Sequence, residues 1–96
     1  MVDPRSSLRL QVFPNPSLRE TTIRLQLPAE EYVHATVVDV AGRRVRILLD
    51  GIHGSGDRDL HWDGRDDEGR DVAPGVYLIR TQTSREIRSS RVVLLR

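Results

Sequence analysis

The 96-residue sequence predicts an all-β sandwich of about seven antiparallel strands with no disulfide bond. Three observations lead to this prediction. Apolar residues recur at every second position, glycine and proline separate segments of roughly ten residues, and no segment has the apolar spacing of a helix. The chain has no cysteine, so packing and hydrogen bonds must hold the two sheets together.

A proline-rich corner separates the first two predicted strands. Apolar residues alternate with polar ones over residues 8–12, which is typical of a half-buried strand. Pro14, Asn15 and Pro16 then end this strand, because proline has no N–H for a ladder and restricts the residue before it. The same alternation returns over residues 21–27 and predicts the second strand.

The third and fourth strands are predicted over residues 33–38 and 45–49, joined by a hairpin turn in which Gly42 supplies a positive φ. Two consecutive valines at the end of the third strand break the alternation. They predict either burial on both faces or a β-bulge that shifts the register. Residues 50–57 contain three glycines and one apolar residue, so they predict an exposed and mobile loop.

An acidic, glycine-containing turn follows the fifth predicted strand, which ends at Trp62. The pairs Asp63-Gly64 and Glu68-Gly69 predict successive tight turns, since carboxylates accept nearby backbone N–H groups and glycine adopts a positive φ. Trp62 closes an alternating apolar segment and is predicted to anchor the core. The turn is therefore predicted to shape the fold.

The two C-terminal strands are predicted over residues 76–83 and 87–95. Gly75 and Tyr77 open the first of them, and Tyr77 fits a tyrosine corner, in which the hydroxyl bonds a backbone group and fixes the crossover between the sheets. The last strand ends in the apolar run Val92 to Leu95. This run predicts a central strand that is covered on both faces.

Together these strands predict a single immunoglobulin-like domain over residues 8–96. Residues 1–7 are expected to be a polar lead-in or the remnant of an expression start. They lack an apolar signal-peptide core, so a secreted parent protein is expected to carry its signal upstream. A domain of this size buries a thin two-layer core and has no room for a large internal substrate cavity.

Charge and composition argue against several functions. Fifteen basic residues against fourteen acidic ones leave a net charge of +1. The two signs are interspersed, which does not favour binding to nucleic acid or to a membrane surface. No apolar segment is long enough for direct insertion into a membrane. All fifteen basic residues are arginine, and those at alternate strand positions predict a solvated outer surface.

No catalytic constellation stands out in the sequence. His34, His53 and His61 fall on separate segments that nothing aligns, so they do not predict a metal site. The serines lack a Gly-x-Ser-x-Gly motif and a linked histidine. The sequence therefore predicts a non-enzymatic domain without a cofactor.

A calcium site in the acidic turn is one alternative. Asp63, Asp66, Asp67 and Glu68 carry the hard oxygen ligands that Ca²⁺ prefers. Their spacing differs from that of an EF-hand. Hydrogen bonds within the turns, or pairing with neighbouring arginines, are the favoured explanation of these acids.

Glycan binding is a second alternative, because many carbohydrate-binding modules are β-sandwiches that stack sugars on exposed aromatic rings. The four aromatic residues are Phe13, Tyr32, Trp62 and Tyr77. A stable core needs at least Trp62 and Tyr77, which leaves at most two rings for a sugar. Glycan binding is therefore the less favoured hypothesis.

Five short motifs occur in order across nearly the whole chain. They are Phe13-Pro14-Asn15-Pro16, residues 38–45, Trp62-Asp63-Gly64-Arg65-Asp66 with Gly69, Pro74-Gly75-Val76-Tyr77, and the final Arg91-Val92-Val93-Leu94-Leu95-Arg96. This pattern resembles the C-terminal sorting domain of the type IX secretion system, and equally the related immunoglobulin-like domain of the flagellar hook-capping protein. Where the sorting-domain family commonly has lysine beside its last apolar run, this chain has arginine, which keeps the charge.

The resemblance implies a domain that closes a large exported protein of a Gram-negative bacterium and is recognised by an outer-membrane translocon. In that family the domain is often removed when the cargo is released or attached to surface lipopolysaccharide. The resemblance places the recognition signal on the last strand, at Arg91, Val92, Val93, Leu94, Leu95 and Arg96. It makes Pro14, Asn15, Pro16, Gly42, Trp62, Asp63, Gly64, Gly69, Gly75 and Tyr77 a structural signature.

The predicted function is that of an accessory domain that acts as a secretion-sorting or cell-surface attachment signal. Its expected partners are an upstream domain of the same parent chain and the secretion or attachment machinery. The expected location is the periplasm in transit, and then the cell surface or the medium. The alternative is a structural or assembly module, either of the hook-cap type or as a spacer beside a catalytic domain.

Overall fold

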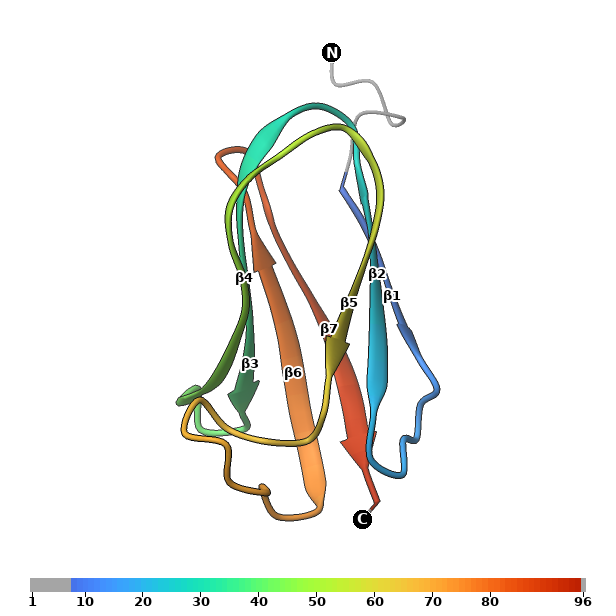
Figure 1. Ribbon diagram of the computed structural model, residues 1–96, viewed down its shortest axis with the longest axis vertical. Helices are drawn as coiled ribbons and strands as arrows, with labels where there is room; N and C mark the ends of the chain where they lie inside the picture. The colour runs from blue at the N-terminus through green and yellow to red at the C-terminus, as the bar shows by residue number, and fades with distance from the viewer. Residues whose placement is uncertain (1–7, 96) are drawn as a thin grey trace.

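In a computed structural model, which describes residues 8–95, the chain forms two antiparallel sheets packed face to face (Figure 1). The strands are β1 (Arg9–Phe13), β2 (Thr21–Leu27), β3 (Glu31–Asp39), β4 (Arg44–His53), β5 (Gly56–Trp62), β6 (Gly75–Gln82) and β7 (Ile87–Leu94). One sheet has the order β1-β2-β5 and the other has the order β4-β3-β6-β7. The predicted immunoglobulin-like β-sandwich of seven strands is confirmed. The predicted lead-in at residues 1–7, and Arg96, lie outside the described residues.

The core lies between the sheets and is built from every second residue of most strands. Its buried members are Leu8, Ile23, Leu25, Leu27, Val33, Ala35, Val37, Leu60, Trp62, Tyr77, Ile79, Val92 and Leu94. This alternation follows from the pleat, which points successive side chains to opposite faces. The sequence period of two thus becomes one buried face per sheet.

Trp62 and Tyr77 anchor one end of this core. Their rings meet edge to face, with centroids 5.2 Å apart, which is a favourable arrangement for two aromatic quadrupoles. The Trp62 Nε1–H donates to the carbonyl of Arg65 at 2.9 Å. The Tyr77 hydroxyl donates to the carbonyl of Ala73 at 2.5 Å, as the predicted tyrosine corner requires. Both polar atoms are therefore satisfied inside an apolar environment.

The predicted exposed loop over residues 50–57 is wrong except at Gly54 and Ser55, which are exposed and lie outside the strands. Strand β4 continues to His53 and β5 begins at Gly56. β3 supplies a complete antiparallel partner here, with Glu31 opposite His53 and Val33 opposite Gly51. Pairing with β3 outweighs the low strand propensity of Gly51, and Gly56 pairs instead with Leu27 on β2.

The last strand is also placed differently from the prediction. The apolar run predicts a central strand, but β7 is an edge strand that pairs only with β6 among the described strands. Val92 and Leu94 point into the core, whereas Leu95 is 55% exposed. The run is continuous because its second face is apolar without being covered by another layer of the domain.

The doubled valine in β3 marks a β-bulge, one of the two predicted outcomes. The register of β3 against β4 shifts between Ala35 and Thr36 and again between Val37 and Val38. Ala35 and Val37 point into the core. Thr36 and Val38, which alternate with them and point to the other face of β3, are also nearly buried. β3 is therefore covered on both faces at this point, as the other outcome required.

Candidate interaction surface on the four-stranded sheet

The last strand separates residues that hold the fold from residues that face solvent. Val92 is 0% exposed and Leu94 is 1% exposed, and both belong to the core. Arg91, Val93 and Leu95 alternate with them and point to the outer face of the four-stranded sheet. Of the residues predicted to form a recognition strand, these three are the described ones whose side chains are exposed or half-buried, and Arg96 lies outside the described residues.

Apolar neighbours extend this part of β7 across the outer face. Val93 lies opposite Val76 on β6, and Arg91 lies opposite Leu78. Val40, which follows β3 directly, is 75% exposed. The residues Val40, Val76, Leu78, Val93 and Leu95 are hereafter called the outer patch. Val40, Val76 and Leu95 are exposed, and Leu78 and Val93 are half-buried. A cluster of accessible apolar groups, unlike scattered ones, is typical of an interaction site.

Residues 15–17 cover the free edge of β7 beside the outer patch. The side-chain amide of Asn15 donates to the carbonyl of Arg91 at 2.9 Å and accepts from the N–H of Val93 at 3.0 Å. The N–H of Ser17 donates to the carbonyl of Val93, and the N–H of Leu95 donates to the carbonyl of Ser17, both at 2.8 Å. This part of the proline corner, with Ser17, thus takes the place of a neighbouring strand. A partner strand cannot pair with this end of β7 without displacing it.

The acidic turn uses its carboxylates as internal hydrogen-bond acceptors. Asp63 accepts from the N–H of Arg65 at 3.1 Å and from the Arg46 guanidinium at 3.2 Å. Asp66 accepts from two backbone N–H groups, those of Glu68 and Arg70, each at 2.9 Å. The bond from the Arg70 N–H is the main reason why the pKa of the Asp66 carboxyl is lowered.

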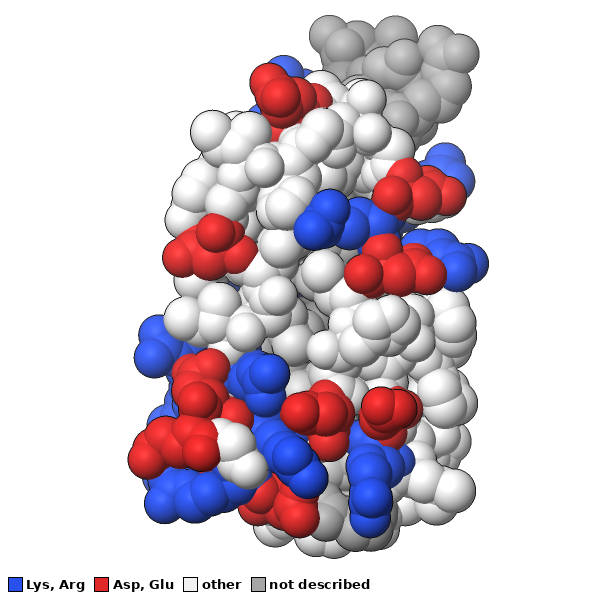
Figure 2. Space-filling view, viewed as in Figure 1, with Lys and Arg blue, Asp and Glu red and all other residues white. Residues whose placement is uncertain are grey.

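Asp67 attaches the acidic turn to the edge of β4. Its backbone N–H donates to the carbonyl of Val45 and its carboxylate accepts from the N–H of Ile47, both at 2.9 Å. Arg44 forms an ion pair with the same carboxylate at 3.2 Å. Glu68 pairs instead with Arg70. Figure 2 shows that charges of both signs gather at the end of the sandwich that carries this turn.

The signature glycines lie in turns or at a strand end. Gly42, Gly64, Gly69 and Gly75 all have positive φ. At Gly64, φ is 77°, and an added Cβ would lie 3.1 Å from the carbonyl oxygen of Arg19. A side chain at this position would therefore meet both backbone strain and a close contact.

The histidines lie apart from one another. His34 on β3 contacts Asp50 at 3.3 Å and His61 on β5 contacts the Thr22 hydroxyl at 3.3 Å, while His53 ends β4. Within residues 8–95, no group of three or more His, Asp or Glu side chains is arranged to hold a metal ion.

The two exposed aromatic rings lie on opposite sheets. Phe13 ends β1 and is 39% exposed, with the Arg24 guanidinium 5.2 Å above its ring. Tyr32 is on β3 in the other sheet, and its hydroxyl donates to Asp50. One flat sugar cannot stack on both rings, so the predicted pair of aromatics does not form a single platform.

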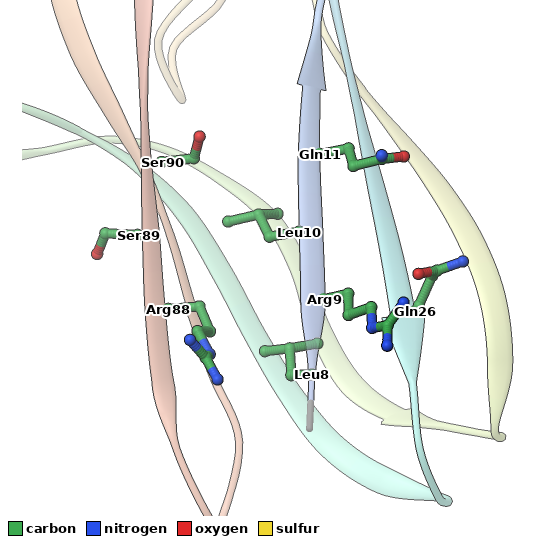
Figure 3. Close-up of a pocket in the computed structure, with 8 residues that line it drawn as sticks. All are labelled: Leu8, Arg9, Leu10, Gln11, Gln26, Arg88, Ser89 and Ser90. Atoms are coloured by element: carbon green, nitrogen blue, oxygen red, sulfur yellow. The ribbon is translucent and has the colours of Figure 1, made fainter. Parts of the chain in front are cut away.

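A groove of about 630 Å³ follows the open edge between β1 and β7 (Figure 3). Leu8 and Leu10 point from β1 toward β7, and Ser90 points back toward β1. At one end the carboxylate of Glu86 accepts from the N–H of Leu8 at 2.8 Å. The lining is made of leucine, arginine, glutamine and serine side chains, which provide no general acid and base pair.

In the part of the chain that the structure describes, no helix has the length and apolar character needed to cross a membrane. The sandwich is elongated, with principal extents of 42, 23 and 22 Å.

The fold and its signature residues define a small immunoglobulin-like module. Residues 17–86 match the FlgD Ig-like domain family, and the chain belongs to that family. No curated protein matches the sequence.

Two solved structures from Porphyromonas gingivalis share the fold. Dimeric latent PorU matches with a TM-score of 0.75 and 19% sequence identity, over 92% of this chain and 9% of the PorU chain. PorZ, described as an essential bacterial surface component of the type-IX secretion system, matches with a TM-score of 0.60 and 24% identity, over 91% of this chain and 11% of its own. The chain thus spans about a tenth of each of these proteins. Its family and size fit an accessory or structural module.

Sequence reasoning missed the two contacts that cover the sheet edges. Asn15 carries a signal in principle, since an amide between two prolines has both a donor and an acceptor to place. Asp67 carries none, because its partner strand is about twenty residues away in the chain and many other acids have the same local setting. Both contacts depend on which segments the fold brings together.

Proposed function

We propose that the chain is a non-catalytic C-terminal accessory domain of a larger exported bacterial protein, in which it acts as a secretion-sorting or cell-surface attachment signal. Its partners are an upstream domain of the parent chain and the secretion or attachment machinery. The parent passes through the periplasm and ends at the cell surface or in the medium. The likeness to PorZ, a surface component of the type-IX secretion system, supports a setting in type IX secretion.

One observation carries the proposal: the last strand keeps an apolar outer face that no layer of the described domain covers. Val93 and Leu95 lie there beside Val76. A domain that needed this strand only for its own stability would gain nothing from apolar residues on that face, because exposed apolar groups add little to folding. A partner that covers the outer patch explains why they are present.

The route of recognition follows from the covered edge of β7. Because Asn15 and Ser17 already bond the backbone of β7 near Val93 and Leu95, strand addition is blocked at this end. The proposed machinery therefore recognises side chains of the outer patch rather than the backbone of the last strand.

Two outward substitutions test this function. A stable reporter is fused to the domain and expressed in a bacterium that has a type IX system. The domain carries Val93→Asp, Leu95→Asp, or both substitutions in a double variant. Export should fall at least tenfold for the double variant, because a charge in an apolar contact must be desolvated. Ile87→Asp is the matched control, since Ile87 is 51% exposed at the far end of β7 and should leave export unchanged.

Circular dichroism and a thermal melt of each purified variant complete the test. If the double variant is folded and still exported at the wild-type level, the proposed function is wrong. Deleting residues 92–96 is a poor test, because Val92 and Leu94 belong to the core and the truncated domain would unfold. Loss of export would then say nothing about recognition.

A structural or assembly module is the second candidate, and membership of the FlgD Ig-like domain family supports it. In this case the domain stabilises or spaces its neighbour in the parent chain. Removing the whole domain would lower the melting temperature of the parent, and its export would remain normal. The two candidates therefore predict opposite results for the export of a parent that lacks the domain.

A further inference from the structure

A shallow hollow lies on the outer face of the four-stranded sheet, next to the outer patch. It has a volume of about 250 Å³ and is lined by His34, Thr36, Val38, Gly42, Arg44, Arg80 and Gln82. Thr36 and Val38 form its floor, and the longer side chains of Arg44 and Arg80 stand on either side. The strand register explains this shape, because Val38 lies opposite Arg44 on β4 and Thr36 lies opposite Arg80 on β6. This feature is hereafter called the arginine hollow.

Arg91 extends the positive charge from the arginine hollow to the outer patch. Arg91 lies opposite Leu78, which precedes Arg80 by two residues on β6 and points to the same outer face. Val38 and Leu78 therefore lie between the three arginines. Each arginine is about one strand spacing, or one pleat repeat along a strand, from one of these two apolar residues.

Of the three arginines on this face, only Arg44 has an ion-pair partner among the described residues, Asp67 at 3.2 Å. On the other parts of the surface, Arg24 pairs with Asp59 and Arg88 pairs with Glu86. Within the described residues, Arg80 and Arg91 form no ion pair. Asp50 is the one carboxylate on the strand positions of this face, and it already accepts from Tyr32 and His34.

We propose that the arginine hollow and the outer patch together bind a protein segment in which acidic residues adjoin apolar ones. The carboxylates would meet Arg80, Arg91 and the exposed side of Arg44, while the apolar residues would cover the outer patch. Charge complementarity selects this occupant, because the surface offers cations next to an apolar area, and the two described carboxylates beside them, Asp50 and Asp67, already have partners. The inference rests on the proposed function, since it specifies the chemistry of the partner that recognises this face.

The floor of the hollow favours side-chain contact with such a segment. Thr36 and Val38 are already nearly buried beneath their neighbours. Binding of a partner there therefore adds little to the free-energy cost of desolvating polar groups. The arginine stems contribute apolar contact and their guanidinium groups bind carboxylates with two N–H donors. An extended segment that lies along β6 would meet Arg80, Leu78 and Val76 in turn.

The test is an NMR titration of the isotope-labelled 96-residue protein with a short acetylated peptide in which glutamates are followed by valine and leucine. Resonances of Arg80, Arg91 and the outer patch should shift, and rising salt should weaken the binding. Arg80→Gln and Arg91→Gln should each raise Kd by about 1.5- to 5-fold, as expected for the loss of one exposed ion pair. Arg58→Gln on β5 is the matched control, because Arg58 is exposed on the other sheet and should leave Kd unchanged.

Several outcomes would overturn the inference. They are the absence of shifts at roughly millimolar peptide, equal binding of a peptide with lysine in place of glutamate, and an equal effect of Arg58→Gln. Identical shifts with inorganic phosphate would show a small-anion site instead. Self-association that Arg80→Gln abolishes would show that a second copy of the chain is the occupant.

The reporter fusion separates this inference from the proposed function. If Val93→Asp and Leu95→Asp stop export whereas Arg80→Gln with Arg91→Gln does not, the sorting function stands and the acidic partner is wrong. If the peptide binds as expected but no outward substitution affects export, the surface binds acidic segments and the proposed role of this surface in sorting is wrong.

Discussion

Two neighbouring leucines at the end of β7 provide the sharpest test of how the last strand is used. Leu94 is 1% exposed and lies in the core, and Leu95 is 55% exposed on the outer face. Leu94→Ala should lower the free energy of unfolding by about 2–5 kcal/mol, because it removes buried methyl groups and leaves a cavity. Leu95→Ala should change it by less than about 0.5 kcal/mol. A domain of this length has about 5–14 kcal/mol in total, so the first change removes a large share.

Urea unfolding followed by tryptophan fluorescence measures this difference. Trp62 is the single tryptophan of the chain and is fully buried, so its emission reports the loss of the core. In a thermal melt, the Leu94 variant should lose about 4–8 °C for each kcal/mol. Equal losses for the two variants, or a larger loss for Leu95→Ala, would refute the assignment of inward and outward residues on which the proposed function depends.

Four further outcomes are expected. Trp62→Ala should cost about 3–5 kcal/mol in urea unfolding followed by circular dichroism, and a stable folded variant would contradict the anchoring role. Asn15→Ala should cost about 1–3 kcal/mol through two lost hydrogen bonds, and hydrogen exchange at Val93 should accelerate. The pKa values of the Asp39 and Asp66 carboxyls are lowered, mainly by backbone N–H donors from Arg43 and Arg70. Their stabilisation is therefore complete above the unfolded pKa of about 4 and is lost as the pH falls through the folded pKa. Asp66→Asn should reduce the loss of stability between roughly pH 5 and pH 3. Calcium followed by a chelator should leave the melting temperature unchanged, and a rise with calcium would restore the metal hypothesis for the acidic turn.

The sequence predicts the strands well where alternation is uninterrupted. The segment Thr21–Leu27 alternates without a break and forms β2 with its apolar residues buried. Residues 50–53 do not show this alternation, because they contain a glycine and polar residues and only one apolar residue. They are nevertheless strand, since β3 is long enough to pair with them. Pairing of this kind is non-local and leaves no mark in the segment itself.

The last strand shows a different limit of sequence analysis. A continuous apolar run has the same appearance whether its second face is covered within the domain or remains exposed for a partner. The prediction of a central strand followed from the first possibility. Val93 is only half-buried and Leu95 is exposed, so the second face of the run is not covered within the described chain. A continuous apolar run therefore does not by itself distinguish a central strand from an edge strand.

The acidic turn was predicted as a turn, and its local hydrogen bonds agree with that prediction. Its attachment to β4 was not predictable, because Asp67 reaches Val45 and Ile47 only after the sheets have assembled. The same holds for Asn15 and the end of β7. Local geometry is encoded in short motifs, whereas the edge that each motif covers depends on the topology.

Both edges of the four-stranded sheet are covered at the same end, and this arrangement limits how a partner can bind. Asp67 bonds the edge of β4 near Val45, and Asn15 bonds the edge of β7 near Val93. Strand addition, which uses exposed backbone groups, is therefore disfavoured there. The outer face at this end carries the outer patch together with Arg80 and Arg91, which are exposed and form no ion pair with any described residue. A partner at this end must recognise side chains across the face of the sheet, which is why substitutions at outward positions separate binding from folding.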